Sequence, residues 1–171
     1  MAMSLKPRLN DQGKPVPNEY EIPDGFTFID EEAFADDAIQ GMTHIQIPES
    51  VTEIGKAAFR NCTTLERITL PESCQVVKDW AFSGCKAARF VDMFDSLETI
   101  GTRAFENCGL VSAVIPPSLK RVGNEIFKGC KSLSKIYFPE SWLAAFAARH
   151  ETDTGVEALF GLKPDVDIMT Y

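Results

Sequence analysis

The chain has 171 residues, of which 44% are hydrophobic and 25% are charged, and this composition is typical of a folded globular protein. Its formal net charge of -8 repels phosphate backbones and anionic lipids, so we expect no nucleic-acid partner. Its apolar runs are much shorter than the roughly 20 residues of a membrane-spanning helix, so we expect no insertion into a membrane.

Residues 1–23 combine prolines with polar side chains, a pattern that predicts an extended segment. We expect this segment to cap the domain by covering the edge of the first strand that follows it. It contains neither the apolar stretch nor the small-residue cleavage site of a signal peptide, which favours a cytoplasmic protein.

The middle of the chain repeats itself with a period of about 23 residues. Clear copies are VTEIGKAAFRNCTTLERITLPES at 51–73 and LKRVGNEIFKGCKSLSKIYFPES at 119–141, with two more between them and a cysteine-free copy at 26–50. A unit of this size with one short strand cannot bury its own apolar face, so the copies must stack. Residues 24–141 are therefore predicted to form a solenoid of five coils whose short strands lie parallel.

Each position within the repeat has a predicted structural role. The alternating segment 67–70 (RITL) predicts a short strand, which ends at Pro71 because proline has no N–H for a strand ladder. Gly55 and its equivalents are expected at a turn that uses the conformational freedom of glycine. A positive φ is predicted just before each repeated cysteine, at Asn61, Gly84, Asn107 and Gly129. We expect one phenylalanine per coil to form an interior ladder of Phe34, Phe59, Phe82, Phe105 and Phe127.

These recurring residues resemble the BspA-like, or treponemal-type, leucine-rich-repeat family. The Ile-Gly, Ala-Phe, Cys, Leu and Ile-x-Leu-Pro elements recur in register across residues 24–141, although Ala88 replaces the leucine and Phe94 the proline of the third copy. The resemblance implies a leucine-rich-repeat solenoid of the α/β repeat class. Family members are commonly bacterial surface or secreted proteins that bind other proteins, so it also implies a non-catalytic binding role outside the cytoplasm.

Residues 142–171 differ from the repeats and are predicted to form a C-terminal cap. Ser141 can cap a helix, and the segment WLAAFAARH that follows it consists mainly of good helix formers. The final VDIMTY is interpreted as a last extended segment. The two ends of the solenoid are therefore expected to be closed by an extended segment and by a helix with a tail.

No catalytic or metal-binding motif emerges from the sequence. Four of the five cysteines occupy one repeat position, so their separation is the repeat period and does not match a zinc site. We interpret them as packed, reduced side chains, because equivalent side chains in stacked coils run parallel whereas a disulfide needs them to converge. The two histidines, His44 and His150, are expected on the surface, and the acidic run at 30–32 on a solvated face. We predict that the protein is not an enzyme and uses no cofactor.

The outward positions of the strands form the predicted binding surface. Phe90, Val114 and Tyr137 are apolar or aromatic where a solvated strand would carry polar side chains, and exposed aromatic residues often anchor interfaces. Two other interpretations remain: Phe90 could turn inward beside the small Ala88, or a tail could cover the apolar residues. The predicted protein-binding residues are His44, Gln46, Arg67, Thr69, Phe90, Asp92, Val114, Lys135 and Tyr137.

We infer from these features a module for protein-protein interaction or adhesion whose partner is another protein. Two alternative functions remain. The first is a structural protein that self-associates edge to edge or face to face. The second is a hydrolase or redox enzyme, which would require one fast-reacting cysteine.

Overall fold

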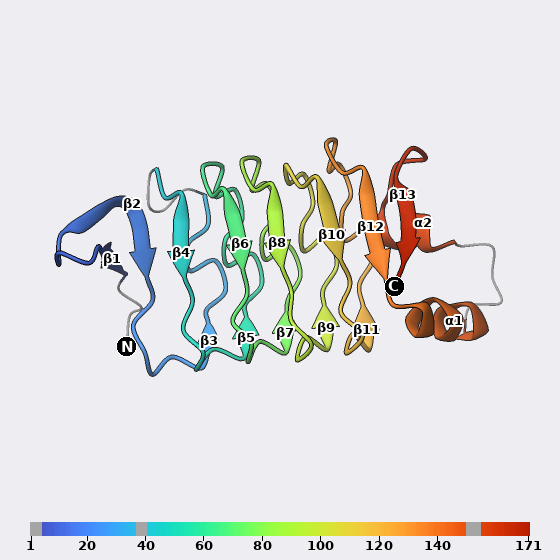
Figure 1. Cartoon of the computed structure of the whole chain (residues 1–171), viewed down its shortest axis with the longest axis horizontal. Coiled ribbons are helices and arrows are strands. Elements are labelled where there is room, and N and C mark those ends of the chain that lie inside the picture. The colour runs from blue at the N-terminus through green and yellow to red at the C-terminus, as the bar shows by residue number, and fades with distance from the viewer. Residues whose placement is uncertain (1–4, 37–40, 150–154) are drawn as a thin grey trace.

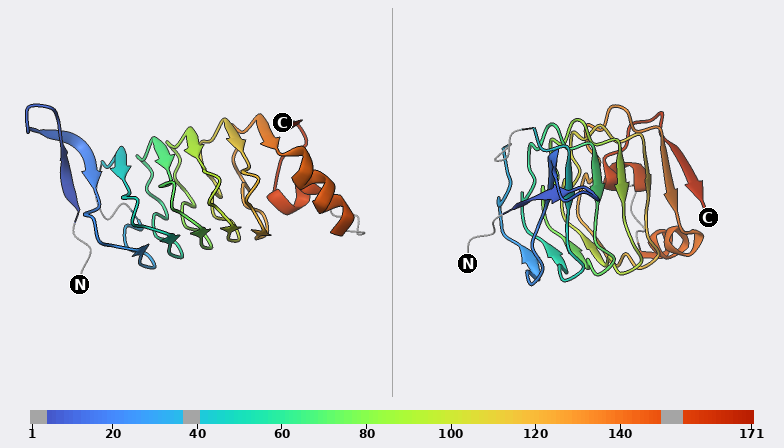
Figure 2. Two further views of the ribbon diagram at one scale, coloured as in Figure 1. Left: turned by 60° about the horizontal axis from the view of Figure 1, so that its bottom comes forward. Right: turned by 60° about the vertical axis from the view of Figure 1, so that its left-hand side comes forward.

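The computed structural model describes residues 5–36, 41–149 and 155–171 and shows an elongated solenoid (Figure 1). Successive coils contribute strands to two faces that run along the molecule, and the strands of the repeats lie parallel (Figures 1 and 2). The predicted leucine-rich-repeat solenoid of about five turns is confirmed. Helices occur only beyond the repeats in the described part of the chain, so the coils themselves consist of strands and turns.

One face, called the strand face below, carries the strands that the alternating sequence pattern predicts. These strands are β2 (Pro15–Glu21), β4 (His44–Gln46), β6 (Arg67–Thr69), β8 (Phe90–Asp92), β10 (Ser112–Val114), β12 (Lys135–Phe138) and β13 (Asp167–Thr170). The middle residues Ile68, Val91, Ala113 and Ile136 are buried, so the residues on either side of them point outward. Strand β2 pairs with β4, β6 pairs with β8, and β12 pairs with both β10 and β13. The hydrogen-bonded pairing is therefore interrupted between β4 and β6 and again between β8 and β10.

A second parallel sheet lines the other face of the solenoid and was not predicted. Its strands, in spatial order, are β11 (Arg121–Val122), β9 (Thr99–Ile100), β7 (Val76–Val77), β5 (Glu53–Ile54) and β3 (Phe28–Ile29). Each has only two residues, which is too short to produce an alternating pattern in the sequence. The second residue of each strand contributes to the core, and Ile54, Val77 and Ile100 are fully buried.

The predicted phenylalanine ladder is confirmed and forms the axis of the core. Successive ring centroids from Phe34 through Phe59, Phe82 and Phe105 to Phe127 are 5.1, 5.0, 5.5 and 5.8 Å apart, and all four pairs are stacked. All five rings are buried. Stacking in this geometry adds to the stabilisation that burial of each ring provides.

The cysteines form a second buried ladder beside the phenylalanines. The four cysteines at the repeat position, Cys62, Cys85, Cys108 and Cys130, are buried thiols as predicted, and Cys74, which lies outside this ladder, is buried as well. The Sγ of Cys85 donates to the carbonyl of Phe59 at 3.3 Å, and the Sγ of Cys108 donates to the carbonyl of Phe82 at 3.1 Å. Each thiol of the ladder therefore bonds to the phenylalanine of the preceding coil, which explains why a small side chain with a weak donor recurs there.

The turns confirm one backbone prediction and correct another. A positive φ occurs at the four predicted positions, with 59° at Asn61 and 81° at Gly84. The glycines of the Ile-Gly element do not have a positive φ, so the expected use of their conformational freedom is wrong. A Cβ at Gly101 would lie 2.4 Å from the backbone nitrogen of Asp79. Glycine is therefore required there because two coils approach closely. A further, unpredicted set of positive φ angles occurs at Glu32, Ala57, Trp80, Arg103 and Glu125.

The N-terminal end of the solenoid is closed by a hairpin. Strand β1 (Lys6–Leu9) pairs antiparallel with β2, and β2 pairs parallel with β4, with Glu19 opposite His44. Strand β2 therefore lies along the edge of the first strand of the repeats, where the sequence predicted an extended segment.

The C-terminal end consists of two helices and the strand β13. Helix α1 (Glu140–Arg149) begins one residue before Ser141, so Ser141 lies in its first turn and is not its N-cap. Helix α2 (Val156–Phe160) and β13 form a partial coil: the Phe127 amide donates to the Phe160 carbonyl at 2.8 Å, and β13 pairs parallel with β12. Neither of these described helices has the length and apolar character to cross a membrane.

Candidate functional site

The strand pairings arrange the outward side chains of the strand face in two rows. The pairings place Arg67 opposite Phe90, and Val114 opposite Tyr137. Of the predicted residues, Gln46, Arg67, Thr69, Phe90, Val114 and Lys135 are exposed, whereas His44, Asp92 and Tyr137 are half-buried. All nine lie on this face, but they do not form one uniform surface, because the outward residues of β4 and β6 are charged or polar whereas those of β8 to β13 include apolar and aromatic residues as well.

Apolar side chains are exposed on the strand face from β8 to β13, between polar ones. Phe90, Val114 and Met169 have exposed fractions of 45%, 50% and 43%. Tyr137 lies between Val114 and Met169, because β12 places it directly opposite both residues. The apolar patch, defined here as Phe90, Val114, Tyr137, Met169 and Tyr171, therefore combines a row on three hydrogen-bonded strands with Phe90, which lies in the other row on the neighbouring β8.

Met169 and Tyr171 belong to this patch but were not predicted. Tyr171 has an exposed fraction of 58%, and its hydroxyl donates to the Ile115 carbonyl at 2.8 Å, so its ring reaches back across the end of β12. Partial burial, with a smaller contribution from Asp95, raises the pKa of Tyr171. The signal was available in the alternation of the final segment VDIMTY, which predicts that alternate side chains share a face.

The side chain of Phe90 points outward and has a polar border. The Arg67 guanidinium lies over the Phe90 ring at 5.4 Å and is 3.5 Å from the Asp92 carboxylate. Thr69 donates to the same carboxylate at 3.1 Å. The interpretation that Phe90 turns inward beside Ala88 is therefore wrong, since Ala88 is fully buried while the Phe90 ring is exposed.

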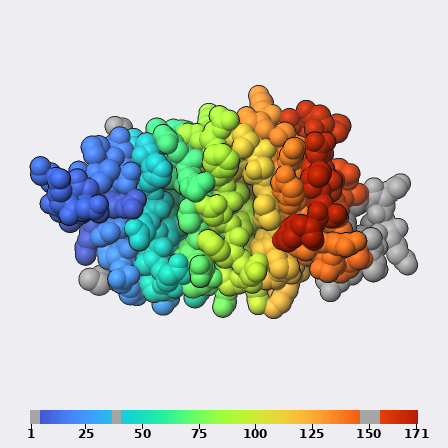
Figure 3. All heavy atoms as spheres, in the orientation of Figure 1, coloured from blue at the N-terminus to red at the C-terminus, as the bar shows by residue number. Residues whose placement is uncertain are grey.

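The described tail residues leave Phe90, Val114 and Met169 of the apolar patch exposed. Figure 3 shows the coils as successive bands of colour along the strand face, with the N-terminal segment confined to the far end from β10 and β12. Strand β13 lies beside β12 and extends the patch. Only Tyr171 of the described tail residues is shown reaching back over a neighbouring strand by a hydrogen bond.

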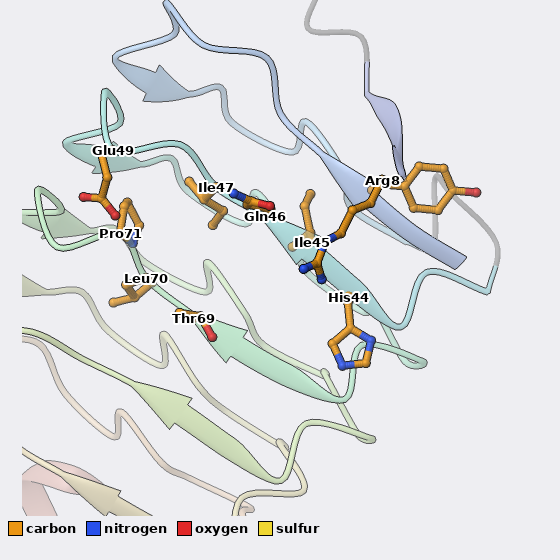
Figure 4. A pocket seen from close by; sticks show the side chains of 10 residues that line it. Arg8, His44, Ile45, Gln46, Ile47, Glu49, Thr69, Leu70 and Pro71 are labelled. Atoms are coloured by element: carbon orange, nitrogen blue, oxygen red, sulfur yellow. The ribbon is translucent and has the colours of Figure 1, made fainter. Parts of the chain in front are cut away.

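An open hollow of about 400 Å³ lies at the interruption between β4 and β6 (Figure 4). Arg8 and His44 lie at its rim, and Arg8 forms an ion pair with Glu19 at 3.1 Å. The His44 Nδ1 is 3.1 Å from the Thr43 hydroxyl, and that hydroxyl donates to the Asn18 carbonyl.

Burial favours the protonated form of three thiols, those of Cys74, Cys108 and Cys130. Burial raises the pKa of Cys74 to about 12 and raises that of Cys108 well above its ordinary value. The hydrogen bond with Cys108, together with burial, raises the pKa of Cys130. Because the thiolate is the reactive species, these cysteines lack the lowered pKa of a catalytic or redox-active thiol.

Ion pairs and hydrogen bonds link charged side chains of neighbouring coils. Glu31 bonds to Lys56 at 2.8 Å, and Asp36 accepts from Asn61 at 2.8 Å and from Arg60 at 2.9 Å. These bonds lower the pKa of Asp36, with the Asn61 contact contributing most. In the described residues no cluster of three His, Cys, Asp or Glu side chains could hold a metal ion, and His150 lies outside them.

Comparison with known protein families explains the repeat. The model of the BspA-type leucine-rich-repeat region matches residues 17–134 with six copies. The chain belongs to the BspA-type leucine-rich-repeat family. The resemblance seen in the sequence is therefore confirmed. The match begins within β2, whereas the boundary that we predicted at residue 23 stays a prediction.

Solved structures of bacterial proteins share this BspA-type fold. A leucine-rich-repeat protein of T. pallidum has 26% identity and a TM-score of 0.61, covering 80% of this chain and 68% of its own. A leucine-rich-repeat protein from Bacteroides ovatus has 21% identity and a TM-score of 0.54, over 79% and 48%. The pneumococcal vaccine antigen PcpA has 20% identity and a TM-score of 0.52, over 72% and 29%.

The lengths of these proteins differ from that of this chain. It spans about two thirds of the treponemal protein and less than half of the other two. No curated protein matches the sequence. The structures with 21% and 20% identity therefore support the fold of this chain alone. Its activity and partners are proposed below.

Proposed function

We propose that this BspA-type repeat module binds another protein through the apolar patch of its strand face and performs no catalysis. The observation that carries the proposal is the row Val114, Tyr137 and Met169, in which three apolar or aromatic side chains oppose one another on adjacent strands. Leucine-rich-repeat proteins generally bind other proteins, which supports the same role.

The physical setting of this row favours binding. Its side chains project from a hydrogen-bonded sheet, so their backbone is already ordered and a partner does not have to order it. Covering exposed apolar surface of this kind stabilises a complex by about 25 cal/mol per Å² before the costs of association. Polar groups at the margin, such as Arg67 and Asp92, resemble the polar rim of protein interfaces.

The expected partner surface follows from this arrangement. It should present an apolar or aromatic side chain to the row and polar groups to Arg67 and Lys135 at its margin. The other predicted residues, His44, Gln46 and Thr69, lie on the polar part of the face and would contribute specificity more than affinity. We propose a location at the bacterial surface or outside the cell from the family resemblance; the expectation of a cytoplasmic protein is the alternative.

The proposal is tested by partner capture with matched variants. Wild-type chain is immobilised and exposed to proteins from the source cell and its neighbours, and retained proteins are identified by mass spectrometry. Val114→Ala combined with Met169→Ala should lose the proteins that wild type retains. Phe28→Ala removes an equally exposed phenylalanine from β3, on the other face, and should retain them. Equal retention by all variants with native circular dichroism would refute the assignment.

A further inference from the structure

The last strand of the sheet leaves backbone groups unpaired. The Asp167 amide donates to the Ser134 carbonyl at 2.8 Å, the Tyr171 amide donates to the Phe138 carbonyl at 3.1 Å, and the Tyr171 carbonyl accepts from Glu140. Alternate residues of a parallel strand face the same neighbour, so the N–H and C=O groups of Ile168 and Thr170 point away from β12. Within the described chain β12 is the only strand paired with β13.

The opposite end of the strand face is built differently. There the outer strand β1 runs antiparallel, contains Pro7, and shifts register between Pro7 and Leu9. Strand β2 also carries Pro15 and Pro17. Prolines and irregular register prevent a further strand from pairing with an edge. Strand β13 has neither feature, since its four residues pair in unbroken register with β12 and include no proline.

The space beside β13 fits a strand better than a further coil. In the left view of Figure 2, as in Figure 1, α1 projects past β13 beneath the layer of the strand face, and no described strand lies beyond β13 in that layer. A second copy of the solenoid would need room for a whole coil at this end, which α1 occupies. A single extended segment needs only the place next to β13.

The side chains of β13 define the chemistry of such a segment. Asp167 is exposed and lies opposite Lys135 of β12, although no ion pair joins these two side chains, and Met169 two residues later lies on the same face. A parallel strand added in register would place one side chain beside Asp167 and another beside Met169. A basic residue followed two positions later by an apolar one is complementary to this pair.

We propose that the free edge of β13 accepts an extended peptide segment of a partner protein as an additional parallel strand, with a basic residue beside Asp167 and an apolar residue beside Met169. The main chain of the segment bonds to Ile168 and Thr170, and its two side chains select it, as in other cases of strand addition. This inference goes beyond the apolar patch, because it depends on the backbone edge and not on Phe90 or Val114.

The test uses a defined probe, the blocked hexapeptide Thr-Lys-Val-Phe-Val-Thr. In the proposed register its Lys lies beside Asp167 and its Phe beside Met169, and the Phe N–H donates to the Ile168 carbonyl. Binding should slow hydrogen exchange of the Ile168 and Thr170 amides. N-methylation at Phe should lower the affinity about tenfold through loss of a main-chain hydrogen bond, whereas N-methylation at the first Val, whose N–H points away, should not.

Matched variants of the protein test the same bonds from the other side. Thr170→Pro removes the outward N–H without removing a bond to β12 and should lower affinity for the peptide about tenfold, whereas Thr170→Val keeps the N–H and should bind like wild type. Replacing Lys by Glu in the peptide should also weaken binding. The proposal would be overturned if both protein variants bound the peptide with equal affinity or if the peptide did not bind. Slower hydrogen exchange confined to Phe90 and Val114 would also overturn it. This readout at Ile168 and Thr170 is separate from partner capture, so the two proposals can fail independently.

Discussion

The ring of Phe160 stacks on the ring of Phe127, with centroids 6.2 Å apart and planes 17° apart. Phe160 lies beyond the cysteine-bearing repeats, yet it continues their phenylalanine ladder and also packs edge-on against Phe138 at 5.1 Å. The indole of Trp142 from α1 closes the same cluster, 5.7 Å from Phe160. The C-terminal segment is therefore an integral end of the core.

Phe160→Ala should destabilise the whole chain. The ring is fully buried and contacts three other rings, so its loss leaves a cavity and is expected to lower the free energy of unfolding by about 3–5 kcal/mol. Urea unfolding followed by circular dichroism measures this change. The control Phe28→Ala removes an exposed ring and should change stability by about 0.5 kcal/mol or less. Similar losses for both variants would contradict the assigned role of Phe160.

Gly101→Ala should be costly although the φ of Gly101 is not positive. Its new Cβ would lie 2.4 Å from the Asp79 nitrogen, so two coils must separate, with an expected loss of about 1–3 kcal/mol in the free energy of unfolding. The matched control is Gly155→Ala, because a Cβ there meets only the end of the Glu157 side chain. Chemical denaturation of both variants decides the point, and a neutral Gly101→Ala would show that the coils are not closely packed at that position.

The buried thiols predict a loss of stability in alkali. The pKa of Cys74 is about 12 in the folded chain, above the roughly 8.5 of an exposed thiol. Folding therefore favours the protonated thiol; this contribution is complete below pH about 8.5 and is lost as the pH rises toward 12, at about 1.4 kcal/mol per pH unit. Cys74→Val removes the titrating group and should reduce the slope of unfolding free energy against pH between about 9 and 11. An unchanged slope would be inconsistent with a buried, protonated Cys74.

Titration with a thiol reagent should separate the binding module from the enzyme alternative. All five cysteines are buried, so in native buffer near neutral pH they should react slowly and together, and in denaturant they should all react rapidly. The absorbance of the product that the reagent releases measures how many thiols have reacted in each condition. One cysteine that reacts rapidly in the native chain would support a redox or hydrolytic role instead.

Light scattering should distinguish a ligand-binding module from the self-associating structural protein. If the protein is a ligand-binding module, the isolated chain should keep the mass of a monomer as its concentration rises. A mass that increases with concentration would favour self-association. Thr170→Pro would then show whether the edge of β13 is the contact, because removal of its outward N–H should restore the monomer.

Much of the fold could be predicted because the repeat displays each requirement several times. The recurrence of phenylalanine and cysteine at one spacing identified the ladders, and Asn61 and Gly84 marked turns with a positive φ. The role of Gly101 was misread, because a sequence shows that a side chain is absent and does not show whether conformation or space demands it. The two-residue strands of the second sheet were missed because they are too short to have a period.

The candidate site was less predictable. Alternation placed Phe90, Val114 and Tyr137 on the outward face, but it did not show that Met169 and Tyr171 lie beside them. Strand β13 is separated from β12 by two helices, and its pairing depends on contacts between residues distant in the chain. No local pattern in VDIMTY specifies that neighbour.

The sequence by itself determined the coil, because every coil must bury the same apolar face against the next and its residues recur for that reason. Only the tertiary structure decided how the segments flanking the described repeats pack, because those segments do not recur in this sequence. There the prolines of β1 and β2 close one edge, Phe160 completes the core, and β13 extends the apolar patch while leaving the backbone of Ile168 and Thr170 unpaired. These features depend on which strand lies beside which, and that is decided by packing across the whole chain.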